Sequence, residues 1–324
     1  MVKSVGLFSG GLDSILAVRF LLDQGIEITG LSFQTPFFGP KYAIRAAKEL
    51  GIKLVIKDIT QEHLRIVKNP KYGYGANMNP CIDCHALMIR EAGKMMEEEG
   101  YDFIFTGEVL NERPMSQTKK SLMLVGRLSG YSEYLLRPLS AKLLPETKPE
   151  KEGLVDRNKL LDLQGRSRKR QLELAKKYGL KEFPSPAGGC LLTDPFFSKR
   201  LKEVFVYNKE CSIRDIELLK IGRHFRIGEK KVIVGRNQKE NQILKNLAKK
   251  SDTLLSAEHI PGPVGLICEG GSQELVEKVA GICVRYSDAK IGGNILPIIY
   301  KIGSSDEEIR PQPVSKDEID SLRI

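Results

Sequence analysis

VGLFSGGLDS, residues 5–14, is the stretch that decides the fold. The apolar run from Ser4 to Phe8 predicts a strand, and the pattern from about Ser14 predicts a helix. The glycines between them permit a ligand to approach the main chain closely, and backbone N–H groups at the start of a helix bind phosphate. The stretch therefore predicts a phosphate-binding turn between the first strand and the first helix.

The same turn distinguishes between classes of nucleotide site. It lacks the Gly-Lys-Ser/Thr ending of a Walker loop, which makes γ-phosphate transfer a poor interpretation. Residues 9–14 instead resemble the pyrophosphate-binding loop of the ATP pyrophosphatase (PP-loop) superfamily, whose members transfer AMP to an oxygen and release pyrophosphate. The resemblance implies that Asp13 holds Mg²⁺ or orients the loop. It also implies that four residues bind the pyrophosphate of ATP: Ser9, Gly10, Gly11 and Ser14. An ordinary capped turn is the alternative.

Short apolar runs alternate with helical patterns through the first half of the chain, which predicts an α/β fold with a parallel sheet. We expect further strands at Glu27–Phe33, Leu54–Asp58, Phe103–Thr106 and Glu133–Arg137. We expect helices at Tyr42–Leu50 and His85–Glu99. Ligands bind such sheets at the carboxyl ends of the strands.

Three further motifs resemble the catalytic domain of the tRNA 4-thiouridine synthetases: Thr106-Gly107-Glu108, Ser116-Gln117-Thr118 and Leu136-Arg137-Pro138-Leu139. The resemblance covers roughly residues 1–200 and implies an adenine-nucleotide alpha-hydrolase-like PP-loop domain. It also implies nucleotide contacts from Thr106, Gly107, Ser116 and Gln117. Arg113 and Arg137 are candidates for offsetting charge on the phosphates. A polar loop in an unrelated α/β enzyme would explain the same residues.

Two of the six cysteines, Cys81 and Cys84, form a Cys-x-x-Cys pair just ahead of the predicted helix at 85–99. A helix start favours thiolate. A redox pair, half of a zinc site and two ligands of an iron–sulfur cluster all remain open. A haem interpretation exists formally because His85 follows the pair.

Cys190 lies in a segment rich in turn formers, Pro-Ser-Pro-Ala-Gly-Gly-Cys. Several tRNA thiolation enzymes of the superfamily are similar in pairing a Cys-x-x-Cys with one distant cysteine. The resemblance implies that Cys81, Cys84 and Cys190 ligate a [4Fe–4S] cluster whose fourth iron stays open for hydrosulfide. Persulfide and disulfide chemistry on the same residues is the alternative. In either version we expect Asp13 and these cysteines to be the catalytic residues.

The second half of the chain has a different rhythm, which predicts a smaller α+β domain. Strands are predicted at Lys231–Val234, Gly265–Cys268 and Ile295–Tyr300, and a helix at Gln273–Tyr286. Residues 234–241 resemble the Val-Gly-Arg-Asn-x-x-x-Asn stretch of NFACT-R RNA-binding domains. Two other stretches, residues 261–267 and 280–287, are also similar to that domain. The resemblance implies that Arg236, Asn237 and Asn241 contact RNA.

These patterns give one organisation: a PP-loop catalytic domain at residues 1–203, an NFACT-R-like domain at 204–303 and a loose polar tail at 304–324. Before the second domain, residues 165–177 predict a basic, exposed helix. The net charge of +10, from 51 Lys+Arg and 41 Asp+Glu, suits a polyanionic partner. No apolar run reaches the roughly 18 residues of a membrane span, so we expect a cytoplasmic protein without a membrane partner.

The expected activity is ATP-dependent thiolation of a tRNA uridine, in which the carbonyl oxygen is adenylated and sulfur then replaces it with release of AMP. We expect 4-thiouridine as the product, with ATP, Mg²⁺ and a [4Fe–4S] cluster as cofactors. The expected partners are tRNA and a donor of sulfide or persulfide, and a homodimer is open. Two other classes stay open: an AMP-forming synthetase or amidotransferase acting on a small molecule, and a non-catalytic RNA- or ribosome-binding protein.

Overall fold

The computed structural model describes residues 1–184, 189–257, 261–287, 298–302 and 305–324. The chain forms two compact units, Met1–Asp194 and Pro195–Ile324. Within the described ranges, none of the helices is long and apolar enough to cross a bilayer.

The first unit is built on a parallel sheet of five strands in the order β3-β2-β1-β4-β5. Their bounds are β1 Lys3–Leu7, β2 Glu27–Gln34, β3 Lys53–Asp58, β4 Phe103–Thr106 and β5 Leu135–Leu136. The order reverses direction between β1 and β4, and Leu7 pairs with Thr106 at the carboxyl ends of these two strands. A crevice at such a reversal is where open α/β sheets bind ligands. The α/β prediction is confirmed.

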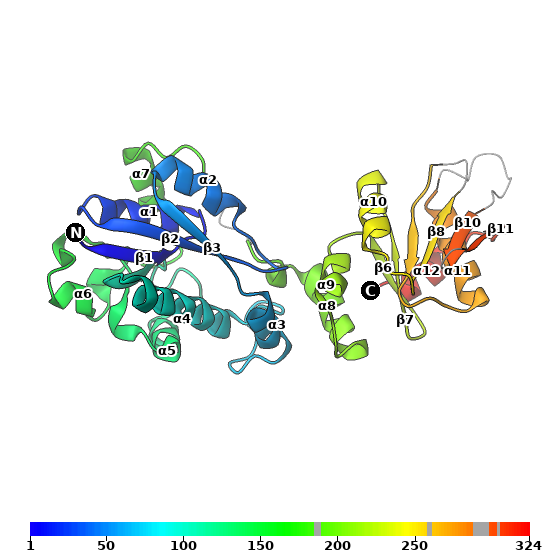
Figure 1. Cartoon of the computed structure of the whole chain (residues 1–324), viewed down its shortest axis with the longest axis horizontal. Helices are drawn as coiled ribbons and strands as arrows, with labels where there is room; N and C mark the ends of the chain where they lie inside the picture. The colour runs from blue at the N-terminus through cyan, green and yellow to red at the C-terminus, as the bar shows by residue number, and fades with distance from the viewer. Residues whose placement is uncertain (185–188, 258–260, 288–297, 303–304) are drawn as a thin grey trace. The chain divides into compact units, whose positions relative to one another are not determined.

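Helices cover both faces of this sheet (Figure 1). Helices α1 (Leu12–Leu22), α2 (Lys41–Leu50) and α7 (Lys169–Lys177) pack on one face. Helices α3 (Thr60–Lys68), α4 (Cys81–Glu99) and α5 (Lys119–Ser129) lie on the other. Each strand supplies both cores because successive side chains point to opposite faces: Phe105 packs towards α1, and Ile104 packs towards α4. The short helix α6 (Lys148–Lys151) follows β5.

Two predicted elements of this unit have different bounds in the structure. Helix α4 begins at Cys81 and not at His85, since the amide of Cys84 already donates to the Pro80 carbonyl oxygen at 2.9 Å. The cysteine pair therefore forms the first turn of the helix. The strand expected at Glu133–Arg137 is reduced to Leu135–Leu136, and the turn before it is a 3₁₀ helix at Ser132–Tyr134.

The second unit contains an antiparallel sheet in the order β11-β10-β8-β9-β7-β6. Its strands are β6 Arg223–Ile227, β7 Lys230–Val234, β8 Thr253–Ala257, β9 Gly265–Ile267, β10 Ile298–Ile302 and β11 Ser305–Ile309. Helices α11 (Gln273–Arg285) and α12 (Lys316–Leu322) contribute to the core on one face, and α9 (Ile213–Leu219) and α10 (Gln238–Leu247) contribute to the core on the other. This is the smaller α+β domain that the sequence predicts.

The ends of the second unit differ from the predicted limits. The division between units falls after Asp194 rather than after residue 203, so the whole of α8 (Pro195–Tyr207) lies in the second unit. The tail that we expected to be loose contains β11 and α12, and its Ile319 is only 2% exposed. Apolar residues spaced along a mostly polar segment were sufficient to fix it against the sheet. Residues 295–297 of one predicted strand lie outside the described residues.

We predict that Gly6→Ala destabilises the first unit. A Cβ on Gly6 would lie 2.1 Å from Cζ of Phe105, so β1 and β4 could not keep their present separation. Overpacking of this kind costs about 1–3 kcal/mol. Urea unfolding followed by far-ultraviolet circular dichroism measures the loss. Gly39→Ala is the matched control, because a Cβ there meets nothing within 4 Å. Equal midpoints for the two variants would contradict the prediction.

Candidate functional site

The turn after β1 has a conformation that glycine permits and serine stabilises. Gly10 has φ of 73°, and a Cβ there would lie 2.3 Å from the carbonyl carbon of Tyr42 in α2. The Ser14 hydroxyl donates to the Gly11 carbonyl oxygen at 2.8 Å, and the amide of Gly11 donates to the Ser9 hydroxyl at 3.3 Å. The turn is thus held in one shape at the amino-terminal end of α1.

The turn after β4 lies directly against the turn after β1. A Cβ on Gly107 would be 2.6 Å from the backbone nitrogen of Ser14, so only glycine allows this approach. Thr106 is buried, and its hydroxyl donates to Glu108 at 3.0 Å. Gly107 therefore supports the shape of the phosphate turn, whereas the Thr106 side chain is committed to Glu108.

Four charged side chains lie near one another at the first turn of α1: Asp13, Glu112, Arg113 and Arg168. Burial raises the pKa of Asp13, while the nearby guanidinium groups of Arg168 and Arg113 act to lower it. Oδ1 of Asp13 is buried and has no hydrogen-bond partner within the part of the chain that the structure describes. Glu112 lies 3.8 Å from Nε of Arg168, and burial together with the charge of Asp13 raises its pKa. An unsatisfied buried carboxylate oxygen beside a phosphate turn fits a divalent cation such as Mg²⁺.

The sequence analysis missed the contribution of α7 to this site. It predicts residues 165–177 as an exposed basic helix, but Gln171 is 1% exposed and its side-chain amide acts on Asp13 by hydrogen bonding. The preceding loop is fixed by a donation from the Gly165 amide to the Leu110 carbonyl oxygen at 2.8 Å. The available sequence signal was the pair Gln171 and Ala175, which are uncharged and lie one helical turn apart within the basic segment. Both are buried in the structure.

The three cysteines predicted to act together do lie near one another. Cys190 precedes a 3₁₀ helix at Leu191–Thr193, and this segment is joined to the loop before α4 by the Met78 amide, which donates to the Leu192 carbonyl oxygen at 3.2 Å. Burial raises the pKa of Cys84 well above its usual value, and the thiols of Cys190 and Cys81 raise it further. Burial also raises the pKa of Cys190 to about 11.

These thiols do not form a ligand set for a metal as they are placed. Among the described residues, no group of three or more His, Cys, Asp or Glu side chains could hold a metal ion. Thiolate sulfur is a suitable donor for an iron–sulfur cluster, but the geometry does not bring the three donors into one coordination sphere. We derive no reaction step through a cluster.

Arg113 connects the thiols with the phosphate turn. Burial raises the pKa of Cys81, and the charge of Arg113 acts to lower it. The same guanidinium acts on Asp13. Its loop is closed by Gln117, whose side-chain oxygen accepts from the Arg113 amide at 3.1 Å. Ser116 and Gln117 are buried, and in the structure they help to shape this loop. Their contact with a nucleotide stays a prediction.

Glu108 links β4, α4 and β5 within the core. Its carboxylate lies 2.8 Å from Nε of Arg137 and 2.9 Å from Nδ1 of His85. Burial would raise the pKa of Glu108, but Arg137 and His85 outweigh it and lower that pKa to about 2. Arg137 is 5% exposed and donates to Glu108 and to the Leu122 carbonyl oxygen, so its effect on the phosphates stays a prediction.

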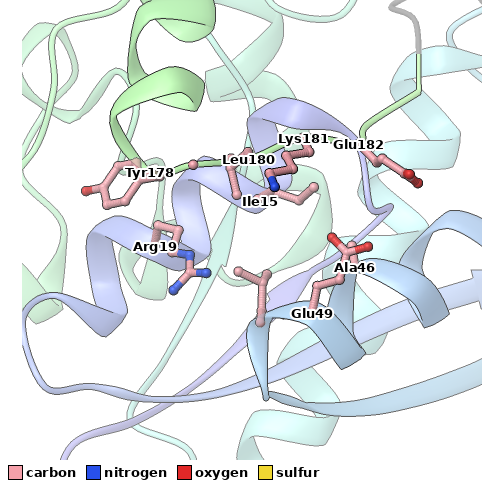
Figure 2. A pocket seen from close by; sticks show the side chains of 10 residues that line it. Ile15, Arg19, Ala46, Glu49, Tyr178, Leu180, Lys181 and Glu182 are labelled. Atoms are coloured by element: carbon pink, nitrogen blue, oxygen red, sulfur yellow. The ribbon is translucent and has the colours of Figure 1, made fainter.

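A cavity of about 300 Å³ lies apart from these residues, between α1, α2 and the segment after α7. Figure 2 shows Arg19, Glu49, Tyr178, Lys181 and Glu182 around it. None of the residues predicted for the nucleotide or the sulfur chemistry lines this cavity. The candidate site is instead the set of turns at the carboxyl ends of β1 and β4.

In the second unit, the three residues predicted to contact RNA lie around the start of α10. Asn237 caps the helix by accepting from the Glu240 amide at 3.0 Å, and Arg236 pairs with the Glu240 carboxylate. Asn241 donates to the Gly262 carbonyl oxygen and accepts from the Val264 amide, both at 3.0 Å. Asn237 and Asn241 thus have local structural roles, while the side chain of Arg236 is 48% exposed. Their contact with RNA stays a prediction.

Comparison with known proteins supports a similar division of the chain. The family model "Thiamine biosynthesis protein (ThiI)" matches residues 2–142. The chain is similar to the tRNA-specific 2-thiouridylase MnmA of Treponema denticola, at 32% identity over 32% of this chain and 32% of that protein. It is also similar to the probable tRNA sulfurtransferase of Methanosarcina mazei, at 30% identity over 34% of this chain and 29% of that protein.

The matched region therefore spans about a third of the length of these curated relatives. A solved 4-thiouridine synthetase–RNA complex with bound ATP overlays with a TM-score of 0.38 at 20% identity, over 68% of this chain and 52% of that chain. The model "NFACT protein RNA binding domain" matches residues 222–323. Residues 2–142 are thus similar to the ThiI family, and residues 222–323 are similar to the NFACT RNA-binding domain.

Proposed function

We propose that this protein is an ATP-dependent tRNA sulfurtransferase that converts a uridine to 4-thiouridine. The observation that carries the proposal is the position of Arg113, whose charge acts both on Asp13 at the phosphate turn and on Cys81 in the thiol group. A uridine bound beside Arg113 would meet the activating phosphate and the sulfur nucleophile in one place. The names of the relatives, 2-thiouridylase and sulfurtransferase, support the same reaction class.

In the first step, the uridine carbonyl oxygen attacks the α-phosphorus of ATP, and pyrophosphate leaves as the α–β bond breaks. The turn at residues 9–14 would hold the pyrophosphate through backbone N–H groups. Asp13 would hold Mg²⁺, which neutralises phosphate charge when bound. Arg168 and Arg113 are already on either side of this carboxylate, so they would offset the charge that develops on the leaving group.

In the second step, a persulfide attacks the adenylated carbon, which expels AMP together with the original oxygen. We assign the persulfide to Cys81, because Arg113 favours its thiolate form. The thiolate of Cys190 then attacks the resulting Cys81 sulfur, which releases the thiocarbonyl product and leaves a Cys81–Cys190 disulfide. An external dithiol reduces that disulfide, and a donor persulfide then transfers its outer sulfur to the Cys81 thiolate and leaves as a thiolate.

The NFACT-type domain would bind the folded part of the tRNA, because shape and backbone charge dominate such recognition. The two domains then have different roles: one positions the RNA and the other performs the chemistry. A small-molecule synthetase would release pyrophosphate without RNA and would not need the cysteines. A ribosome-binding protein would release none.

We predict that Arg168→Ala slows tRNA-dependent pyrophosphate release by roughly 10²–10³-fold, which is typical for removal of a group that stabilises developing negative charge. Arg170→Ala is the matched control on the same helix, since Arg170 pairs with Asp162 at the surface. A coupled pyrophosphate assay with ATP and a pool of transcribed tRNAs measures both variants. Equal rates for the two variants would limit Arg168 to a packing role.

We further predict that Ser substitutions at Cys81 and Cys190 abolish thiolation, whereas Cys84→Ser abolishes it only if a cluster carries the sulfur. All three variants should keep pyrophosphate release within about threefold, since sulfur enters only after adenylation. Nucleoside mass spectrometry detects the thiolated product and distinguishes 4-thiouridine from 2-thiouridine. Cys268→Ser is the control, because the proposal gives Cys268 no role. If all four variants thiolate tRNA alike, the assignment of the cysteines is wrong.

The same preparations separate two forms of the sulfur chemistry. Protein purified without oxygen is analysed for iron, and alkylated peptides are analysed for a persulfide on Cys81. Iron that disappears in the three Ser variants would favour the cluster that the sequence resemblance implies. A trapped persulfide in iron-free, active protein would favour the two-step scheme above.

A further inference from the structure

The loop between α3 and α4 (Figure 1), residues 69–80, contains two tyrosines whose side chains are exposed. Tyr72 is 40% exposed and Tyr74 is 39% exposed. The fold does not require these surfaces to be aromatic, since neither ring belongs to a core cluster of the described residues. Exposed aromatic rings on one loop suit a ligand with a flat apolar face.

Local hydrogen bonds hold this loop in place. The amide of Tyr72 donates to the carboxylate of Asp83 at 3.0 Å, and Asp83 lies between the two cysteines in the first turn of α4. The hydroxyl of Tyr74 donates to the Val67 carbonyl oxygen at 2.7 Å. These bonds fix the backbone at one tyrosine and the ring edge of the other.

The loop also borders the thiols. A Cβ on Gly75 would lie 3.1 Å from Sγ of Cys81 and 3.6 Å from Cγ of Met115, a side chain that is 54% exposed. Further along, the amide side chain of Asn77 donates to the Thr193 carbonyl oxygen at 2.7 Å, three residues beyond Cys190. The aromatic side chains therefore belong to a loop that contacts Cys81 at one point and the Cys190 segment at another.

We propose that Tyr72 and Tyr74 form a stacking surface for the uracil base that is thiolated. This inference rests on the proposed function and names the residues that receive the substrate. A base in a folded tRNA must leave its stack before a cysteine sulfur can reach its ring, and aromatic side chains replace the lost stacking. Lys71, whose Nζ lies 5.8 Å from the centroid of the Tyr72 ring, adds a cation for the adjacent phosphate.

The size of the surface favours a base over a protein partner. A stable protein interface buries about 800 Å² on each side and includes some 20–30 residues. The exposed apolar side chains of this loop and its neighbour are only Tyr72, Tyr74 and Met115 among the described residues. One or two nucleobases match that surface, and stacking on tyrosine does not depend on the base sequence around them.

The first test is kinetic and uses the full chain. Tyr72→Ala and Tyr74→Ala should each lower kcat/KM for tRNA by roughly 5- to 150-fold, the range of base-stacking contributions. Tyr72→Phe and Tyr74→Phe retain the rings and should stay within about threefold of the wild type. Phe196→Ala is the matched control, because Phe196 is 73% exposed and lies in the second unit. The affinity for ATP alone should be equal in all variants.

The second test is physical and does not require turnover. Transcribed tRNA that carries 5-iodouridine is bound to the wild-type protein, irradiated and digested, and mass spectrometry locates the cross-linked residue. Cross-links should fall on Tyr72 or Tyr74, and Tyr→Ala substitution should remove them. Thermal unfolding of each variant verifies that the loop substitutions leave the first unit folded.

The outcomes separate this inference from the proposed function. Active wild-type protein with cross-links elsewhere and unaffected Tyr→Ala kinetics overturns the stacking surface and leaves the sulfurtransferase standing. Inactive wild-type protein with cross-links on the tyrosines overturns the activity and supports the stacking surface. A loss of thiolation in the Tyr→Ala variants only with a protein sulfur donor, and not with a small-molecule persulfide, would show that the loop docks a protein and would overturn the inference.

Discussion

The close approach of two backbone turns is the constraint on which the site depends. The turn after β4 lies against the first turn of α1, where a side chain on Gly107 would reach 2.6 Å from the Ser14 nitrogen. On its other side, the phosphate turn contacts α2, where a Cβ on Gly10 would lie 2.3 Å from the carbonyl carbon of Tyr42. Both contacts are between main chains, so the turn is fixed by the sheet and by α2 before any ligand binds. Such preorganisation lowers the cost of binding an anion.

Helix α4, which carries Cys81 and Cys84, is connected to the end of β4 by the buried carboxylate of Glu108. Glu108 follows Gly107, and it engages Arg137 on one side and His85 on the other. Removal of one partner from a buried pair typically costs 3–5 kcal/mol, because the remaining charge loses its compensation. The first turn of α4, with its two cysteines, is therefore held in register with the phosphate turn by charge as well as by packing.

The structural elements that depend on local sequence pattern could be predicted from the sequence. Periodicity and the glycine turn were sufficient for the parallel sheet of the first unit and for the smaller α+β second unit. The sequence analysis did not find α7 as part of the site, because the burial of Gln171 and the approach of Arg168 to Asp13 arise from tertiary packing. The pairing of Arg137 with Glu108 could not be predicted either, because a motif does not reveal the partner of a charge. The helix start at Cys81 differed by a few residues, as helix boundaries often do.

The carboxyl groups and thiols of the site are partly or fully buried, so their charged forms require charge from a bound ligand to be stabilised. Burial raises the pKa of Asp13, of Glu112 and of all three clustered thiols, so the ionised forms that the chemistry requires are disfavoured in the protein alone. Stability measured without ligands should gain little from these groups, since each is costly to ionise. A cation bound at Asp13 would offset the cost of ionising this carboxylate, while the charge of Arg113 acts on both Asp13 and Cys81.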